Sequence, residues 1–203
     1  MKGGIFMAIY LHPLREHATC KRKVLDANKF TIDHITGYMT EDNNYNALVK
    51  VKGIDDYLRG RSEMVLLSKD LESIFIELTK TGKYKLPGGG WDENEDYMAC
   101  AIRETKEEIH YLSSNVKYVE GKDYIEMYTT PKATYQKTIP EQYQWAGVYT
   151  KVYCGIEDGL YKQRVNNQDQ DDLAWKGRFY KISEVYNILL PVHKEAIKIQ
   201  QEV

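Results

Sequence analysis

Short apolar runs of strand length alternate with polar turns along most of the chain. The runs at residues 64–68 and 73–78, MVLLS and SIFIEL, are typical of short strands, and a polar turn separates them. Further strands are expected near residues 4–11, 30–34, 47–51, 116–120, 124–128, 142–154 and 179–182. The pattern therefore predicts a chain built largely from short strands.

Helical spacing replaces this pattern between residues 96 and 109. Met98, Ala101, Ile102, Thr105 and Ile109 recur at intervals of three, one, three and four residues. This spacing places all five on one buried stripe of an α-helix. A second helix is expected to begin after Pro191, because proline suits the first turn of a helix.

Residues 1–61 form a mixed segment that differs from the tighter pattern after it. The stretch GRSE at residues 60–63 is a plausible boundary. We therefore expect an N-terminal, strand-containing extension at residues 1–61 and a main domain at residues 62–203. The strands of the extension can pair with the sheet of the main domain or with a second subunit, which leaves a homodimer open.

Composition limits the classes of function. The 203 residues carry a net charge of −2, with 42% hydrophobic and 29% charged residues. This share of hydrophobic residues is enough to form a packed core. The slightly negative net charge argues against a protein that coats polymeric nucleic acid. The three cysteines, Cys20, Cys100 and Cys154, are scattered without a CxxC motif, which indicates free thiols in a reducing compartment. The apolar N-terminal run is too short to span a membrane, so we expect a cytoplasmic protein.

The stretch LPGGGWDENEDYMACAIRETKEEIHY at residues 86–111 carries the candidate chemistry. Glu104 and Glu108 lie on one flank of the predicted helix, with Glu107 beside them. Their oxygen atoms are the ligands that Mg²⁺ or Mn²⁺ prefers. Because glycine has no Cβ, the glycine run can turn sharply near a ligand and leave the Gly88 carbonyl free to face a metal ion.

This stretch also has other interpretations. An acidic run on a helix is also typical of a solvated face, and three glycines are also typical of a loop. A calcium-binding loop starting at Asp92 is excluded, because Tyr97 stands where that loop needs glycine and Arg103 where it needs glutamate. A P-loop is excluded because no Gly-Lys-Ser/Thr follows the glycines.

The combination of glycine and charged residues at fixed spacing resembles the signature of the Nudix hydrolases, G-x5-E-x7-R-E-U-x-E-E-x-G-U, where U is a bulky apolar residue. The glycine and the five charged positions are filled by Gly89, Glu95, Arg103, Glu104, Glu107 and Glu108. The sequence departs from the signature at Thr105, His110 and Tyr111. His110 stands where the signature has a glycine in a left-handed backbone conformation. This departure therefore concerns how the helix ends and not the acids.

The resemblance implies a mixed sheet between helices, an α/β/α sandwich, acting as a metal-dependent pyrophosphohydrolase on a nucleoside diphosphate linked to another group. It implies that Glu104 and Glu108 are the main ligands of Mg²⁺ or Mn²⁺. Glu107 would be a further ligand or would hold a metal-bound water, and the Gly88 carbonyl another ligand. Glu95 and Arg103 would pair with each other across the loop and the helix.

Several residues of the sequence are candidates for the general base and for the substrate contacts. A glutamate of the signature at residues 89–111, called the box below, or an acid on a later loop can be the base, and our hypothesis is that Asp171 or Asp172 reaches the metal site. The other acids considered are Asp169 and Glu141. Surface turns explain these acids as well.

Aromatic side chains can stack on a base, although most are expected in the core. The candidates are Trp91, Trp145, Trp175 and Tyr128, the last lying 17 residues past the box. Some dinucleoside-polyphosphate hydrolases of the family carry a tyrosine at that spacing. The proline that many ADP-ribose hydrolases carry near position 16 is not matched, since Pro131 lies 20 residues past the box.

The main rival to an enzyme is a nucleotide-binding sensor with the same fold but no turnover. The complete set of acids favours catalysis, and no pair of DNA-binding helices is evident in the sequence. In either case the expected partner is a small nucleotide, without a membrane or polymeric nucleic acid.

Overall fold

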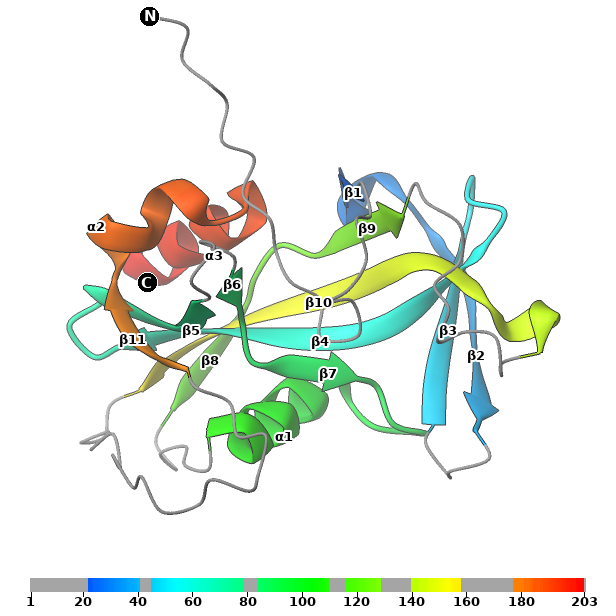
Figure 1. The fold of residues 1–203 in the computed structure, drawn as a ribbon, viewed down its shortest axis with the longest axis horizontal. Helices are drawn as coiled ribbons and strands as arrows, with labels where there is room; N and C mark the ends of the chain where they lie inside the picture. Colours follow the sequence, from blue (N-terminus) through cyan, green and yellow to red (C-terminus); the bar gives the residue numbers. More distant parts are fainter. Residues whose placement is uncertain are drawn as a thin grey trace, which may run out of the picture.

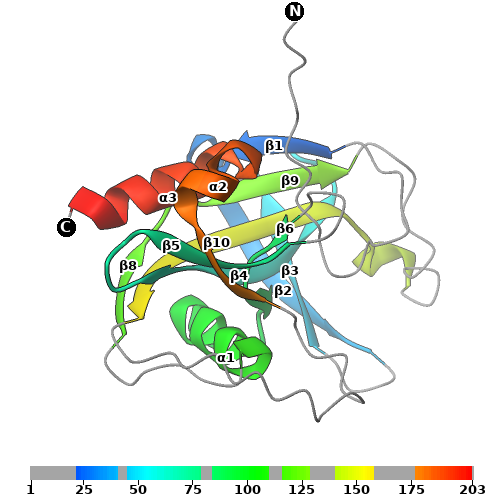
Figure 2. The same ribbon diagram turned by 60° about the vertical axis from the view of Figure 1, so that its left-hand side comes forward.

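The computed structural model describes residues 22–40, 45–78, 84–109, 116–128, 140–157 and 177–202. Within them, eleven strands form one sheet whose main path runs β1-β9-β10-β4-β3-β2. Helix α1 (Tyr97–Ile109) covers one face, and α2 (Ile182–Val185) and α3 (Pro191–Glu202) cover the other (Figures 1 and 2). The expected α/β/α sandwich with a mixed sheet is confirmed.

Two long strands form the centre of the sheet. β4 (Tyr57–Ser68) and β10 (Trp145–Glu157) run parallel in register from Tyr57 and Trp145 onward, with a bulge between Trp145 and Gly147. Both strands are buried almost throughout. Helices α1 and α3 cover the two faces of their later residues, and Leu58 and Tyr149 in their earlier residues pack in a separate cluster with Val49 and Trp91. The other strand pairs are antiparallel, so the sheet is mixed.

The N-terminal strands belong to the same sheet. β1 (Arg22–Asp26) pairs with β9 (Tyr124–Tyr128), and β2 (Ile32–Met39) pairs with β3 (Tyr45–Val51), which pairs with β4. No break in the structure marks the boundary suggested at residues 60–63, because β4 continues through these residues. The strand expected at residues 4–11 lies outside the described residues.

Three of the remaining strands lie close to the expected positions, and two short strands, one of them formed by the glycine run, were not expected. β5 (Ser73–Leu78) pairs with β4, β6 (Tyr84–Lys85) and β11 (Arg178–Lys181). β7 (Gly88–Gly90) pairs with β4, and β8 (Lys117–Glu120) pairs with β10. In the described part of the chain, three short 3-10 helices join these elements: η2 (Ala27–Lys29), η4 (Glu141–Tyr143) and η5 (Tyr186–Ile188).

The core divides between the two faces of the sheet. On the α3 side, Val65 and Val152 of the central strands pack with Ala196 and Ile197 of α3. On the α1 side, Met64 and Leu66 of β4 pack with Ala101 and Ile109 of α1. Pro191 is the first residue of α3, as expected. No helix of the described part of the chain is both long and apolar enough to span a membrane.

The expected apolar stripe of α1 is only partly right. Ala101, Thr105 and Ile109 are buried, but Met98 is 38% exposed and Cys100 is fully buried instead. Thr105 fits this face because its hydroxyl donates to the Ala101 carbonyl at 2.6 Å, which satisfies the polar atom inside the helix. A polar residue at this position of the signature therefore does not disturb the packing of α1.

Cys100 and Cys154 are free and buried, and burial raises the pKa of each thiol to about 12. Because the thiolate is the reactive form, a Cys20→Ser variant should show no fast-reacting thiol in the native state. We expect labelling by a disulfide reagent to be at least about a thousandfold slower than for an ordinary cysteine. In denaturant both thiols should react at once. One fast thiol in the native variant would contradict the burial of these side chains.

Candidate active site

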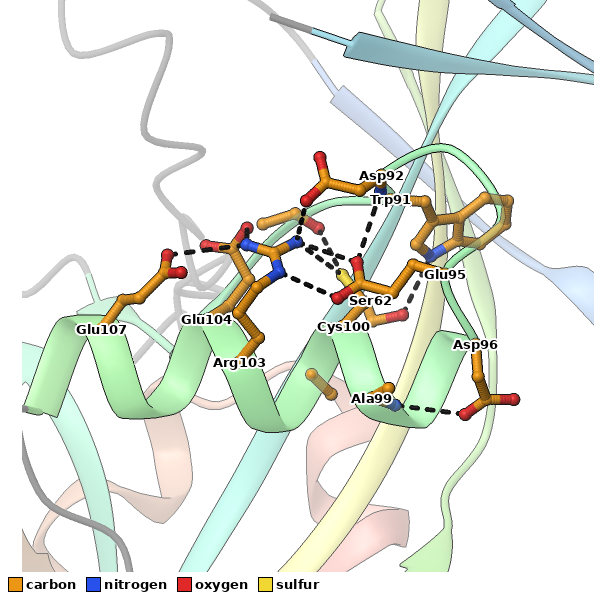
Figure 3. Close-up of polar contacts among 12 residues, drawn as sticks. Ser62, Trp91, Asp92, Glu95, Asp96, Ala99, Cys100, Arg103, Glu104 and Glu107 are labelled. Carbon is orange, nitrogen blue, oxygen red and sulfur yellow. Dashed lines mark hydrogen bonds and ion pairs between the residues drawn. The ribbon is translucent and has the colours of Figure 1, made fainter.

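Helix α1 begins at a side-chain cap. Asp96 Oδ1 accepts hydrogen bonds from the Met98 and Ala99 amides at 3.0 and 3.1 Å (Figure 3). An aspartate in this position satisfies amide groups that have no partner within the helix. The cap therefore fixes where α1 begins and which residues its first turns present to the glycine segment.

Trp91 anchors the loop that precedes α1. Its Nε1 donates to Ser62 Oγ at 2.9 Å, and only 2% of the residue is exposed. One ring face lies against Gly60, where an added Cβ would come within 2.3 Å, and the ring lies 4.3 Å from that of Tyr97. The expectation that Trp91 could stack on a base is therefore corrected, since its ring is enclosed by the protein.

The glycine segment β7 lies against β4 in antiparallel register, with Gly88 opposite Glu63 and Gly90 opposite Arg61. Gly88 has a φ of +153°, and an added Cβ would lie 2.4 Å from the Ser62 carbonyl oxygen. At Gly89, an added Cβ would lie 2.1 Å from Cδ of Glu104. The first glycine thus lets the strand approach β4, and the second lets a carboxylate approach the strand.

Replacing Gly88 by alanine should destabilise the fold by about 2–4 kcal/mol, because the new methyl group meets backbone atoms of β4. Gly53→Ala is the matched control. Gly53 also has a positive φ, +87°, but nothing lies within 4 Å of an added Cβ, so its cost is conformational, about 1 kcal/mol. Thermal denaturation should rank Gly88→Ala well below Gly53→Ala. Equal melting temperatures would contradict the close packing of β7.

Arg103 joins the loop to the acidic helix. Its Nε and Nη2 donate to the two oxygens of Glu95 at 2.8 and 2.9 Å, and Nη1 lies 2.8 Å from Glu104 Oε1 and 3.5 Å from Glu107 Oε2 (Figure 3). Nη2 also donates to the Gly90 carbonyl at 3.3 Å and lies 3.2 Å from Asp92. The expected pairing of Glu95 with Arg103 is present, in the two-pronged geometry that holds a carboxylate most rigidly.

The three helix glutamates have different surroundings. Glu104 has 18% of its side chain exposed, and burial raises its pKa, although Arg103 opposes this effect. The side chain of Glu107 is 59% exposed. Glu108 Oε2 accepts a hydrogen bond from the Gly88 amide at 3.0 Å. Glu104 and Glu108 therefore both contact β7, and Glu107 lies toward solvent.

The carboxylates are held by Arg103 and by a backbone amide. Within the described residues, no group of three or more histidine, cysteine, aspartate or glutamate side chains is arranged to hold a metal ion. The chemistry of the donors nevertheless fits a hard divalent cation, since three carboxylates on adjacent turns beside a bare backbone segment offer only oxygen. A partly buried carboxylate such as Glu104 gains most from a nearby positive charge.

Of the remaining sequence candidates, some lie on other elements and the rest lie outside the described residues. Glu141 is exposed on η4. Trp145 is 3% exposed, with the Arg59 guanidinium 5.8 Å from its ring. Tyr128 is the last residue of β9. Asp169, Asp171, Asp172, Trp175 and His110 lie outside the part of the chain that the structure describes.

Two residues that support the site were not singled out as such from the sequence. Ser62 holds the indole of Trp91, and the Cys100 thiol donates to the Gly90 carbonyl at 3.3 Å. Neither residue type signals such a role, because each acts through a contact made only after β4, β7 and α1 have packed together. The helical period could have placed Cys100 near the buried face, since it adjoins Ala101.

A family model for the NUDIX domain matches residues 57–197. The chain belongs to this family. The match starts at the first residue of β4 and ends within α3, so it includes both faces of the sheet and the whole acidic helix. Membership confirms the expected Nudix pyrophosphohydrolase at the level of the enzyme family.

Several solved Nudix structures resemble this chain. RenU, a Nudix hydrolase from M. smegmatis, is 11% identical, with 82% of this chain and 94% of that chain covered and a TM-score of 0.43. A mutT/nudix family protein from Listeria innocua is 20% identical, covering 74% and 98%, and the C. elegans Ap4A hydrolase is 15% identical, covering 71% and 96%. Both have a TM-score of 0.43. No curated protein matches the Nudix chain significantly.

Proposed function

We propose that this Nudix protein hydrolyses the pyrophosphate linkage of a nucleoside diphosphate joined to another group, with Mg²⁺ or Mn²⁺ as cofactor. The observation that carries the proposal is the contact of both Glu104 and Glu108 with β7: Glu104 lies over Gly89, and Glu108 accepts the Gly88 amide. Two carboxylates four residues apart therefore meet one glycine segment, with Glu107 beside them.

Glu104, Glu107 and Glu108 would hold the cation, with the Gly88 carbonyl as a further ligand. A bound divalent cation would neutralise negative charge on the diphosphate and would lower the pKa of the attacking water. Glu107 is exposed enough to turn toward a ligand from its contact with Arg103, which is long at 3.5 Å. Glu108 is fixed in place by the Gly88 amide.

Arg103 and Glu95 would act as support for these acids. By pairing with Glu95 in the loop and with Glu104 on the helix, Arg103 keeps the loop and α1 at a fixed spacing. Its positive charge also lowers the repulsion among the neighbouring carboxylates. For the general base, Asp171 and Asp172 stay our candidates, and turnover that is unchanged in the double asparagine variant would exclude both.

The proposal is tested with a panel of nucleoside diphosphate derivatives that includes ADP-ribose and dinucleoside polyphosphates. Release of a nucleoside monophosphate or phosphate is measured with Mg²⁺, with Mn²⁺ and with a chelator. We expect turnover of at least one compound, dependent on the cation. Tight binding of a compound without any product would favour the nucleotide sensor instead.

A further inference from the structure

A cluster of four fully buried polar side chains lies on the α3 side of the sheet, where His193 of α3 contacts Glu63 and Tyr84. Its members are Glu63 of β4, Tyr84 of β6, Tyr124 of β9 and His193 of α3, each with no exposed surface. None of the four lies within the stretch at residues 86–111 that carries the acids of α1. A buried charge destabilises the fold unless it is paired, so the contacts among these side chains have to offset that cost.

The hydrogen bonds of this cluster form a chain. His193 Nε2 lies 2.5 Å from Glu63 Oε1, and His193 Nδ1 lies 2.6 Å from the Tyr84 hydroxyl. The Tyr84 hydroxyl accepts from the Leu190 amide at 2.7 Å, and the Tyr124 hydroxyl donates to Glu63 at 3.2 Å. The Arg61 guanidinium lies 3.8 Å from Glu63. Burial also raises the pKa of Tyr84 well above its usual value, so its hydroxyl keeps its proton.

The chain ends on both sides of Gly88. Glu63 is the direct cross-strand partner of Gly88, and an added Cβ on Gly88 would lie 2.7 Å from Glu63 Cα. Tyr84 begins the segment that leads into Gly88, and the adjoining Met64 amide donates to the Pro87 carbonyl at 2.9 Å. His193 thus contacts both Glu63, on the strand opposite Gly88, and Tyr84, on the segment that precedes Gly88 in the sequence.

We propose that Glu63, Tyr84, Tyr124 and His193 form a positioning cluster that fixes Gly88 and, through the Gly88 amide, Glu108. The metal-binding part of this inference rests on the proposed function. The fixing of Gly88 does not, since it concerns only the backbone between Tyr84 and Gly90. Helix α3 thereby acts on the acidic site from the far side of the sheet, through His193.

Tyr84→Phe and His193→Gln test the cluster, because each keeps most of the side-chain volume while breaking the chain of hydrogen bonds. Ile197→Val is the matched control, since Ile197 lies on α3 in the same core but has no polar atom in its side chain. The first measurement is hydrogen exchange of the Gly88–Gly90 amides at a fixed interval below each melting temperature. We expect protection to fall about tenfold or more in the two cluster variants and to stay unchanged in Ile197→Val.

The second measurement is Mn²⁺ affinity together with kcat and KM. Loss of the partners behind a ligand typically weakens metal affinity or activity by about 10–100-fold, so we expect that loss in Mn²⁺ affinity and kcat, with KM nearly unchanged. Unchanged Gly88–Gly90 protection in both cluster variants would overturn the inference, whatever the activity. Lost protection in the two cluster variants, together with a wild type that binds no Mn²⁺ and turns over nothing, would remove the proposed function while leaving the fixing of Gly88 supported.

Discussion

A variant in which Glu104 is replaced by glutamine is expected to fold normally and to turn over its substrate about a thousandfold more slowly than the wild type. The amide keeps the size of the carboxylate and can still accept the hydrogen bond from Arg103, which lies at 2.8 Å. What it loses is the negative charge that would face a cation. We expect the same loss for Glu108→Gln, whose side-chain oxygen can still accept the Gly88 amide.

The matched control is Glu93→Gln, the same chemical change at an exposed residue of the turn before α1. It should leave kcat, KM and the melting temperature close to the wild type, since exposed substitutions without special contacts have small effects. Mn²⁺ titration of the three variants separates binding from chemistry. Full activity in both Glu104→Gln and Glu108→Gln would rule out these carboxylates as cation ligands.

Much of the fold could be predicted from local pattern. The strands at residues 73–78 and 124–128 match the structure at both ends, and the helix from residue 96 begins one residue late because Asp96 is its cap. Such elements are recognisable because the spacing of apolar residues follows the geometry of a strand or helix. The acids of α1 could be placed for the same reason, since helical spacing alone puts Glu104 and Glu108 on one flank.

The errors come from contacts between distant segments. GRSE at residues 60–63 suggests a boundary between segments. Gly60 instead lies under the indole of Trp91, and Ser62 is buried where it accepts a hydrogen bond from that indole. Strand β10, which pairs with β4 throughout this stretch, is far away in the sequence. Tertiary packing of this kind overrides the local signal, which also explains why Trp91 looked available to a substrate.

The positioning cluster around His193 could not have been found from the sequence. Glu63 and His193 are 130 residues apart, and Tyr84 and His193 are 109 apart. Each looks like an ordinary polar residue in its own segment, without spacing or composition to mark it. Only the placement of α3 over β4 and β6 shows that these side chains meet, whereas the residues of the acidic helix lie within one continuous stretch.

Arg103→Met should lower stability at neutral pH by about 2 kcal/mol, or roughly 4–8 °C in Tm for a chain of this size. The variant removes the guanidinium group that Glu95, Glu104 and Glu107 share. The expected loss of stability is kept small because the Arg103 side chain is 30% exposed and solvent screens its charge. Lys106→Met is the matched control, since it removes one positive charge from an exposed position on the same helix. It should change stability by less than about 0.5 kcal/mol.

The effect of Arg103→Met should also depend on pH. The hydrogen bonds from Arg103 are the main reason that the pKa of Glu95 lies below its usual 4.5. A carboxyl group with a lowered pKa in the folded state adds stability above the unfolded pKa, and this stability is lost as pH falls through the folded pKa. The difference between wild type and variant should therefore be full at neutral pH and shrink below about pH 4.5. Thermal denaturation across this range measures it, and a difference that grows on acidification would show that the Glu95 pair does not stabilise the loop.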